Sequence, residues 1–287
     1  MRHLLLLLFA LLPLPCCIMA EEAPLRVLSF NLRYINTEDT GAKMWTERRD
    51  AVGALIRKDA ADFIGVQEAF RLMLDDVKAR APGYGEVGVG REDGNAKGEY
   101  SAILYRQEVW KVADSGTFWL SDTPEVPGSA TWGNKVTRIC TWGKFTRKQG
   151  GREVWVFNAH FDHQSQRCRE KGAALILKRI SERGSEAPVI LTGDFNATPE
   201  NPAITAFTQG PPAFTDAWLA LNAKTPAAES GTFHSFNGKH DGPRIDYIFT
   251  TPGITPLECS ILHDHTGGNF PSDHFPVKAT LQLPAAK

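Results

Sequence analysis

The stretch "LTGDFNATPE" (residues 191–200) is the end of an apolar strand that runs into a polar turn. The apolar part begins with Val-Ile-Leu at 189–191, and Asp194 and Asn196 stand at the exit. Asp and Asn are common turn formers, and the Thr-Pro-Glu that follows could simply begin a helix. A reactive site at the mouth of a sheet is the other interpretation. The rest of the sequence has to decide between the two.

Eight further runs have the length and composition of β-strands, and four segments show helical periodicity. Together with residues 188–195, the predicted strands cover residues 25–32, 62–69, 100–106, 109–116, 138–146, 153–161, 244–250 and 275–283. The predicted helices cover residues 46–58, 70–80, 166–183 and 202–208, with Thr46 as the N-cap of the first. This pattern predicts an α+β fold, an α/β sandwich of four layers in which two face-to-face, mostly antiparallel sheets are flanked by helices.

The N-terminus has the pattern of a secretory signal peptide. A basic start precedes an apolar run that ends in small residues at Ala20. This run is too short for a membrane-spanning helix, which needs about 20 apolar residues. Cys16 and Cys17 make lipoprotein anchoring a less favoured alternative. We therefore expect a secreted or periplasmic protein without a transmembrane anchor, with residues 1–20 as leader and residues 21–287 as one domain.

The charge and cysteine counts bear on two questions, nucleic-acid binding and zinc binding. The chain has 32 basic and 33 acidic residues, a formal net charge of -1. Proteins that bind nucleic acid through phosphate contacts usually have a basic face, which this total neither shows nor excludes. Three of the five cysteines, Cys140, Cys168 and Cys259, follow the predicted leader. The sequence has no Cys-x-x-Cys spacing that would indicate a zinc site, and the pairing of these cysteines stays open.

Polar side chains recur where the predicted strands end. They are Asn31, Glu68, His160, Asp194 and Asp246, and the C-terminal pair Asp273 and His274 joins them. Each alone is more often structural than chemical, but together they indicate a site where neighbouring strands meet. Carboxylates and amides without thiolates suit a hard divalent cation, Mg²⁺ first, with Mn²⁺ or Ca²⁺ as alternatives. Such an ion with a base, hydrogen-bond donors and a proton source is what phosphoester hydrolysis requires.

Seven sequence blocks occur in a characteristic order: SFNLRY, GVQEA, EYSAILYR, FNAHFDH, GDFNATPE, RIDYIF and SDHFPV. Over residues 26–278 the chain resembles the endonuclease/exonuclease/phosphatase superfamily, which includes deoxyribonuclease I, abasic-site endonucleases, neutral sphingomyelinases and inositol polyphosphate 5-phosphatases. The resemblance implies a metal-dependent hydrolase of phosphoester bonds. Arg33 stands where abasic-site endonucleases have an Asp, which argues against abasic-site repair.

The resemblance also implies roles for the residues of these blocks. Asn31, Glu68 and Asp273 would hold the divalent ion, directly or through water. Asp194 would orient or deprotonate the attacking water, and Asn196 would donate to a phosphoryl oxygen. The acid and the amide of the opening stretch would then both belong to the reaction.

Two imidazoles complete the implied site. His274 would contact the scissile phosphate, and Asp246 would orient it and favour its charged form. His160 would be the second imidazole on the phosphate side. Glu99 matches the acid that supports this second imidazole in deoxyribonuclease-like members.

Substrate selection falls to the segments between the blocks. Residues 116–145 contain Trp119, Trp132, Trp142 and Arg138. One interpretation is a structured loop whose tryptophans pack locally; the other is a substrate wall in which Arg138 meets phosphate and a tryptophan contacts a base, sugar or lipid.

Further candidates lie beyond this segment. Asp162 and His163, just past His160, are predicted substrate-binding residues. The remaining histidines, His234, His240, His263 and His265, are expected at the surface or the rim of the site rather than as metal ligands.

The substrate itself stays open among three classes of phosphoester: nucleic acid, phospholipid head groups such as sphingomyelin, and small phosphorylated sugars or inositols. The near-neutral charge and the lack of an extended apolar hairpin favour a soluble phosphodiester or phosphomonoester. No obligate protein partner is expected. A binding module that kept the fold and lost the chemistry is the alternative from a different functional class.

Overall fold

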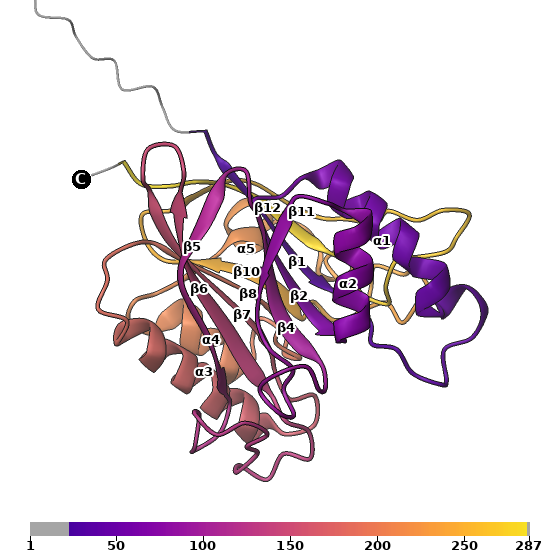
Figure 1. The fold of residues 1–287 in the computed structure, drawn as a ribbon, viewed down its shortest axis with the longest axis horizontal. Helices are drawn as coiled ribbons and strands as arrows, with labels where there is room; N and C mark the ends of the chain where they lie inside the picture. The colour runs from indigo at the N-terminus through magenta and orange to yellow at the C-terminus, as the bar shows by residue number, and fades with distance from the viewer. Residues whose placement is uncertain (1–22, 286–287) are drawn as a thin grey trace, which may run out of the picture.

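The structure is a computed structural model that describes residues 23–285, so the predicted leader lies outside the described residues. Two six-stranded sheets pack face to face, and helices lie outside them (Figure 1). This arrangement confirms the predicted four-layer sandwich. Within residues 23–285, no helix combines the length and the apolar character that crossing a membrane requires.

The first sheet has the order β11-β12-β1-β2-β4-β3. Its strands are β1 (Leu25–Asn31), β2 (Phe63–Ala69), β3 (Tyr84–Val87), β4 (Tyr100–Arg106), β11 (Thr255–Ile261) and β12 (Val277–Gln282). The pair β1 and β2 is parallel, and the other pairs are antiparallel. A short 3-10 turn, η1 (Gly41–Lys43), precedes helix α1 (Trp45–Asp59), which lies with α2 (Arg71–Arg80) beside this sheet (Figure 1).

The second sheet has the order β5-β6-β7-β8-β10-β9. Its strands are β5 (Trp110–Trp119), β6 (Ile139–Arg147), β7 (Glu153–His160), β8 (Val189–Asp194), β9 (Thr215–Asp216) and β10 (Asp246–Thr250). Only β7 and β8 are parallel. Helices α3 (Gln166–Ser181) and α4 (Pro202–Gln209) pack on it, and α5 (Ala217–Asn222) and η2 (Ala227–Glu229) follow β9.

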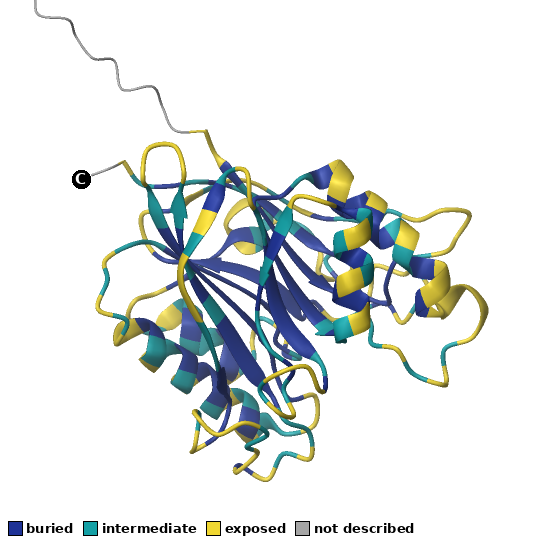
Figure 2. Ribbon diagram, in the orientation of Figure 1, coloured by how far each residue is buried: buried dark blue, intermediate teal, exposed yellow. Residues whose placement is uncertain are grey.

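The apolar residues fall into three clusters that match the layers. One fills the space between the sheets and includes Val27, Phe63 and Ile190; the others lie under α1 and α2 and under α3 and α4. Figure 2 shows most strands buried and the helices exposed only on their outer faces. Burial of each large apolar side chain stabilises the fold by about 1.5–3 kcal/mol.

Local details differ from the sequence prediction. Twelve strands form within residues 23–285 rather than about nine; β3, β9 and β11 were not predicted, because they are short or, in β11, mostly exposed and interrupted by Pro256. Helix α5 was also missed. The prediction of Thr46 as the N-cap is wrong, because the helix already includes Trp45 and Met44 is the N-cap. The indole N–H of Trp45 donates to Asp76 on α2.

Candidate active site

The strand ends meet at a cavity of about 970 Å³. Of the twelve predicted site residues, nine line it: Glu68, Glu99, Arg138, His160, His163, Asp194, Asn196, Asp273 and His274. Asn31 and Asp246 lie directly behind the lining and hydrogen-bond to it. Strand register brings three of these residues together, because His160 pairs with Asp194 across β7 and β8, and Asp194 pairs with Asp246 across β8 and β10.

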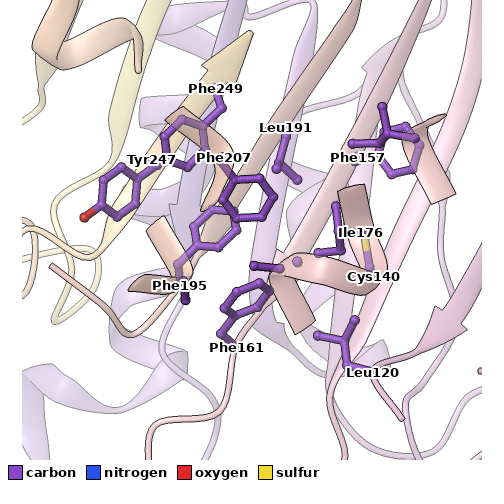
Figure 3. Close-up of a cluster of buried hydrophobic side chains, with 14 of the residues drawn as sticks. Leu120, Cys140, Phe157, Phe161, Ile176, Leu191, Phe195, Phe207, Tyr247 and Phe249 are labelled. Carbon is purple, nitrogen blue, oxygen red and sulfur yellow. The ribbon is translucent and has the colours of Figure 1, made fainter. Parts of the chain in front are cut away.

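Phe195 explains how the exit of β8 presents two polar groups. Its ring is fully buried in the cluster shown in Figure 3, with centroids 4.8 Å from Phe161 and 5.5 Å from Phe207. The flanking Asp194 and Asn196 both line the cavity. Asn196 has a φ of 47°, and its backbone N–H donates to Asp194 Oδ1 at 2.9 Å. The aromatic anchor and this Asx turn fix both polar side chains.

Asp194 is the centre of the constellation. Its Oδ2 accepts from Asn31 Nδ2 at 2.9 Å and lies 3.5 Å from His160 Nε2 and 3.8 Å from His274 Nε2. Burial raises the pKa of Asp194, and the neighbouring charge of Asp246 raises it further. A carboxylate whose proton affinity is raised in this way is suited to accept a proton from water.

His274 is held as the charged imidazole. Its Nδ1 lies 2.9 Å from Asp246 Oδ2, and both side chains are buried. Burial acts to lower the pKa of His274, but the charge and hydrogen bond of Asp246 outweigh it, and the pKa lies well above its ordinary value. Thr232 in turn fixes the start of β10, because its hydroxyl accepts from the backbone N–H groups of Ile245 and Asp246.

His160 is held as the neutral imidazole. Burial and the positive charge of Arg138 lower its pKa well below the ordinary value. His160 Nε2 lies 3.1 Å from Asn196 Nδ2, and the second ring nitrogen is Nδ1. That Nδ1 is buried and has no hydrogen-bond partner in the described part of the chain. One carboxylate therefore lies between two imidazoles of different charge.

The predicted ion ligands lie around the same carboxylate. Asn31 Nδ2 donates to Glu68 Oε1 at 3.1 Å, and Glu68 Oε2 accepts from the backbone N–H of Tyr34. Glu68 has a φ of 61° at an irregularity in the pairing of β2 with β4, which turns its side chain out of the strand alternation. Burial raises the pKa of Asp273, and the charge of Glu68 adds to the rise.

These carboxylates fit a divalent cation. Ligand atoms of Glu68, His160 and Asp194 all lie within 4.8 Å of one another. Arg33 supplies part of the nearby positive charge, at 3.7 Å from Asp273 Oδ2, but its main partner is Asp39 at 3.0 Å. Asp194 and Asp273 are buried carboxylates with raised pKa values, so a bound cation would stabilise their charged forms, and an oxygen-rich set is what Mg²⁺ or Mn²⁺ prefers.

A buried polar network connects the two sheets directly behind the site. Asn158 Nδ2 donates to the backbone oxygens of Val66 and Ala102, both at 2.9 Å. Its Oδ1 accepts from Gln67 Nε2 at 2.7 Å and from Thr192 Oγ1 at 3.0 Å. Asn158 and Thr192 each stand two residues before a site residue, His160 and Asp194 respectively. The network therefore fixes the relative positions of the strand ends at the cavity.

The cationic side of the cavity differs in part from the sequence interpretation. Glu99 accepts two hydrogen bonds from Arg91, at 2.7 and 2.6 Å, so its observed partner is an arginine, and its support of His160 stays a prediction. Arg138 is buried, and its Nη2 lies 3.0 Å from His163 Nδ1. Burial, followed by the charge of Arg91, lowers the pKa of Arg138.

The tryptophans of residues 116–145 follow the local-packing interpretation. Trp119 donates to the oxygen of Arg91, and Trp132 donates to Asp122. Trp142 packs on Trp155 with ring centroids 5.2 Å apart. The lining of the cavity includes none of the three, whereas Arg138 does line it, and its contact with phosphate stays a prediction.

Asp162 lies apart from the cavity lining. Its Oδ1 accepts from the backbone N–H groups of Gln164 and Ser165, which shapes the turn before α3. Contact with substrate remains only a prediction for this residue. His234, expected at the surface or rim, is instead buried, with its ring stacked on Phe275 at 3.8 Å.

Several site residues were missed by the sequence reasoning. Arg91, Phe233 and Phe236 line the cavity but lie outside the seven sequence blocks, and Tyr34 lines it from the first block, where it was given no role. Arg48 on α1 is buried and donates to the backbone oxygens of Lys43, Leu32, Arg33 and Pro271. The last three of these residues lie within two positions of Asn31 or Asp273, which are predicted ion ligands.

Comparison with known proteins shows which family the chain belongs to. The family model described as "Endonuclease/Exonuclease/phosphatase family" matches residues 28–274. The chain belongs to this family. Its members and their structural neighbours include enzymes that hydrolyse phosphoesters, and the chain is an enzyme of this kind. The family depends on a divalent metal.

Solved structures support the same assignment. An endonuclease/exonuclease/phosphatase from Bacteroides vulgatus is 36% identical, with a TM-score of 0.84, over 91% of this chain and 100% of that chain. A mannosyl-6-phosphatase from Bacteroides thetaiotaomicron is 37% identical, with a TM-score of 0.82, over 90% of this chain and 99% of that chain. D. rerio TDP2, complexed with a single-strand DNA product, is 19% identical with a TM-score of 0.72, over 91% and 99%, and shows the shared fold alone.

Proposed function

We propose that the chain is a divalent-metal-dependent phosphoesterase that hydrolyses small soluble phosphoesters, with a phosphorylated sugar as the leading candidate. The observation that carries this proposal is the position of Asp194 Oδ2 between neutral His160 and charged His274. The mannosyl-6-phosphatase at 37% identity supports a sugar phosphate. The near-neutral net charge of -1 gives no support to a strong nucleic-acid binder.

In this proposal each polar residue has one task. Asp194 would orient the attacking water and take its proton. His274 would face the phosphoryl group as a cation held by Asp246, and Asn196 and His160 would contact phosphoryl oxygens. Asn31, Glu68 and Asp273 would hold Mg²⁺, with Mn²⁺ or Ca²⁺ as alternatives. A bound ion of this type would neutralise the phosphoryl charge and favour in-line attack by water.

The side of the cavity that contains Arg138 and His163 would bind the rest of the substrate anion. Arg138 and His163 line it next to His160, and the Nε and Nη1 atoms of Arg138 have no hydrogen-bond partner within the described residues. A guanidinium that is buried and incompletely paired is well suited to phosphate oxygens. Asp162 would act through the turn that precedes α3.

A substrate panel tests the proposal. Phosphate or product release is measured with Mg²⁺, with Mn²⁺ and with EDTA, on mannose 6-phosphate, inositol phosphates, bis-p-nitrophenyl phosphate, plasmid DNA, RNA and sphingomyelin. We expect metal-dependent turnover that is fastest on a small soluble ester. Fastest turnover of DNA or RNA would make the protein a nuclease, and fastest turnover of sphingomyelin a phospholipase. No turnover on any substrate would favour a binding module.

We also propose that the protein is exported after removal of residues 1–20, because these residues have the pattern of a signal peptide. The mass of the mature protein recovered from cells tests this step. Retention of the first 20 residues would contradict it, and a lipid adduct on Cys16 or Cys17 would replace secretion by anchoring.

A further inference from the structure

The rim of the cavity contains a turn with an unusual backbone. Ser235 and Phe236 have φ values of 48° and 62°, and the backbone N–H of Asn237 donates to the oxygen of His234 at 2.9 Å. Two successive residues in the left-handed region form a turn that normally contains Gly, Asn or Asp, and other residues adopt it at a cost in free energy. Side chains persist in such conformations where their surroundings hold them, often at ligand sites.

This turn is hydrogen-bonded to the segment that carries Asp273 and His274. The backbone N–H groups of His234 and Ser235 both donate to the oxygen of Asp273, at 2.9 and 3.1 Å. Phe233 forms a bridge with His274, and the two rings lie 5.0 Å apart. The strained turn is therefore fixed to the residues that would hold the ion and face the phosphate.

The turn presents an aromatic ring to the cavity. Phe236 and Phe233 line it together with Tyr34. The Phe236 ring lies 5.5 Å from the Arg48 guanidinium carbon and 5.7 Å from Lys43 Nζ, so that two cations border it. The polar residues Glu38, Thr40 and Ser235 line the same cavity.

We propose that Tyr34, Phe233 and Phe236 form a subsite for the sugar ring of the leaving group. A sugar has an apolar C–H face that packs on aromatic rings and hydroxyl groups that bond to side chains such as Glu38 and Thr40. This inference rests on the proposed phosphoesterase function and specifies its substrate class.

The test compares a sugar ester with an ester that lacks a ring. Turnover of mannose 6-phosphate and of methyl phosphate is measured for the wild type, Phe236→Gly, Phe236→Tyr and Ser235→Gly. We expect Phe236→Gly to lower kcat/KM for mannose 6-phosphate by about 10-fold, mainly through KM, and to leave methyl phosphate within about 2-fold. Phe236→Tyr keeps the ring and should keep the preference. Ser235→Gly relieves strain without removing the ring, so its Tm should not fall.

Binding separates this inference from the proposed function. Calorimetric titration of the same two esters into the EDTA-treated wild type and Phe236→Gly needs no turnover. Loss of mannose 6-phosphate affinity in Phe236→Gly alone would support the subsite even if no ester is hydrolysed. The subsite would be overturned if Phe236→Gly changed the affinity for both esters equally or for neither. It would also be overturned if the wild type bound both esters equally or bound neither. Phosphoester hydrolysis would still be decided by its own assay. Tighter binding of a nucleoside monophosphate than of the sugar ester would assign the rings to a base.

Discussion

Replacement of Asn158 by leucine should destabilise the protein strongly. Asn158 makes four hydrogen bonds of 2.7 to 3.0 Å, three of them to the other sheet and one to Thr192 on the neighbouring strand β8. Leucine has the same branching but no polar atom, so the oxygens of Val66 and Ala102 lose their side-chain donor. Gln67 Nε2 and Thr192 Oγ1 lose one acceptor each but retain others, in Gly65 and Phe157. Each buried carbonyl without a partner costs about 1–3 kcal/mol, so we expect a loss of about 2–5 kcal/mol.

The tight packing at this point leaves little room for relaxation. A Cβ on Gly65 would lie 2.0 Å from Thr192 Oγ1 and 2.6 Å from Asn158 Oδ1. Because a methyl group is larger than the oxygen or nitrogen it replaces, overpacking adds to the cost. The same substitution should lower kcat/KM at temperatures where the variant stays folded, since His160 stands two residues further along β7.

Urea unfolding followed by tryptophan fluorescence measures the change in unfolding free energy. Asn95→Leu is the matched control, because Asn95 lies exposed in a loop, and its effect should stay within about 0.5 kcal/mol. If Asn158→Leu were as stable as the control variant, the network would not be what holds the two sheets in register, and this reasoning would be refuted.

Three further predictions follow from the site. Asp246→Asn should lower kcat by about 10–100-fold, because the amide no longer holds His274 charged, and steady-state kinetics at temperatures where the variant stays folded would check it. Mg²⁺ at about 100 times its Kd should stabilise the protein by about 2.7 kcal/mol, seen as a rise in Tm that Glu68→Gln removes; an equal rise in both proteins would contradict the ligand assignment. Burial lowers the pKa of His234 to about 4 from an ordinary 6.5, so the unfolded chain binds this proton more readily. Stability is then complete above pH 6.5 and falls between pH 6.5 and 4, and in EDTA His234→Asn should show a flatter profile across that window.

The part of the site that the sequence predicts lies on regular strands. Asp194 and His160 end parallel neighbours of one sheet, and Asp246 begins the next strand in register with Asp194. Strand ends in register must lie close together, so the apolar runs that identify the strands also place these side chains. The two-sheet architecture follows from the same runs, whereas β11, with one buried residue, lacks the apolar signal.

The part that the sequence misses lies in loops. Arg91 reaches Glu99 across a loop whose path no periodicity specifies. Ser235 and Phe236 adopt positive φ without the Gly or Asn that would announce it. In the Trp-rich segment, residues 116–145, the sequence offered a substrate wall as one interpretation. The indole N–H groups of Trp119 and Trp132 instead donate to partners within the fold, and neither residue lines the cavity.

Substitution of one atom at the centre of the site tests the central claim most directly. Asp194→Asn keeps the shape of the side chain and removes the charge that would take a proton from water. Metal-dependent hydrolysis of the best substrate is measured for the wild type, for Asp194→Asn, and for Asp114→Asn as an exposed control on β5. We predict a loss of about 10²–10⁴-fold in kcat for Asp194→Asn and none for the control. Full activity of Asp194→Asn would contradict the account.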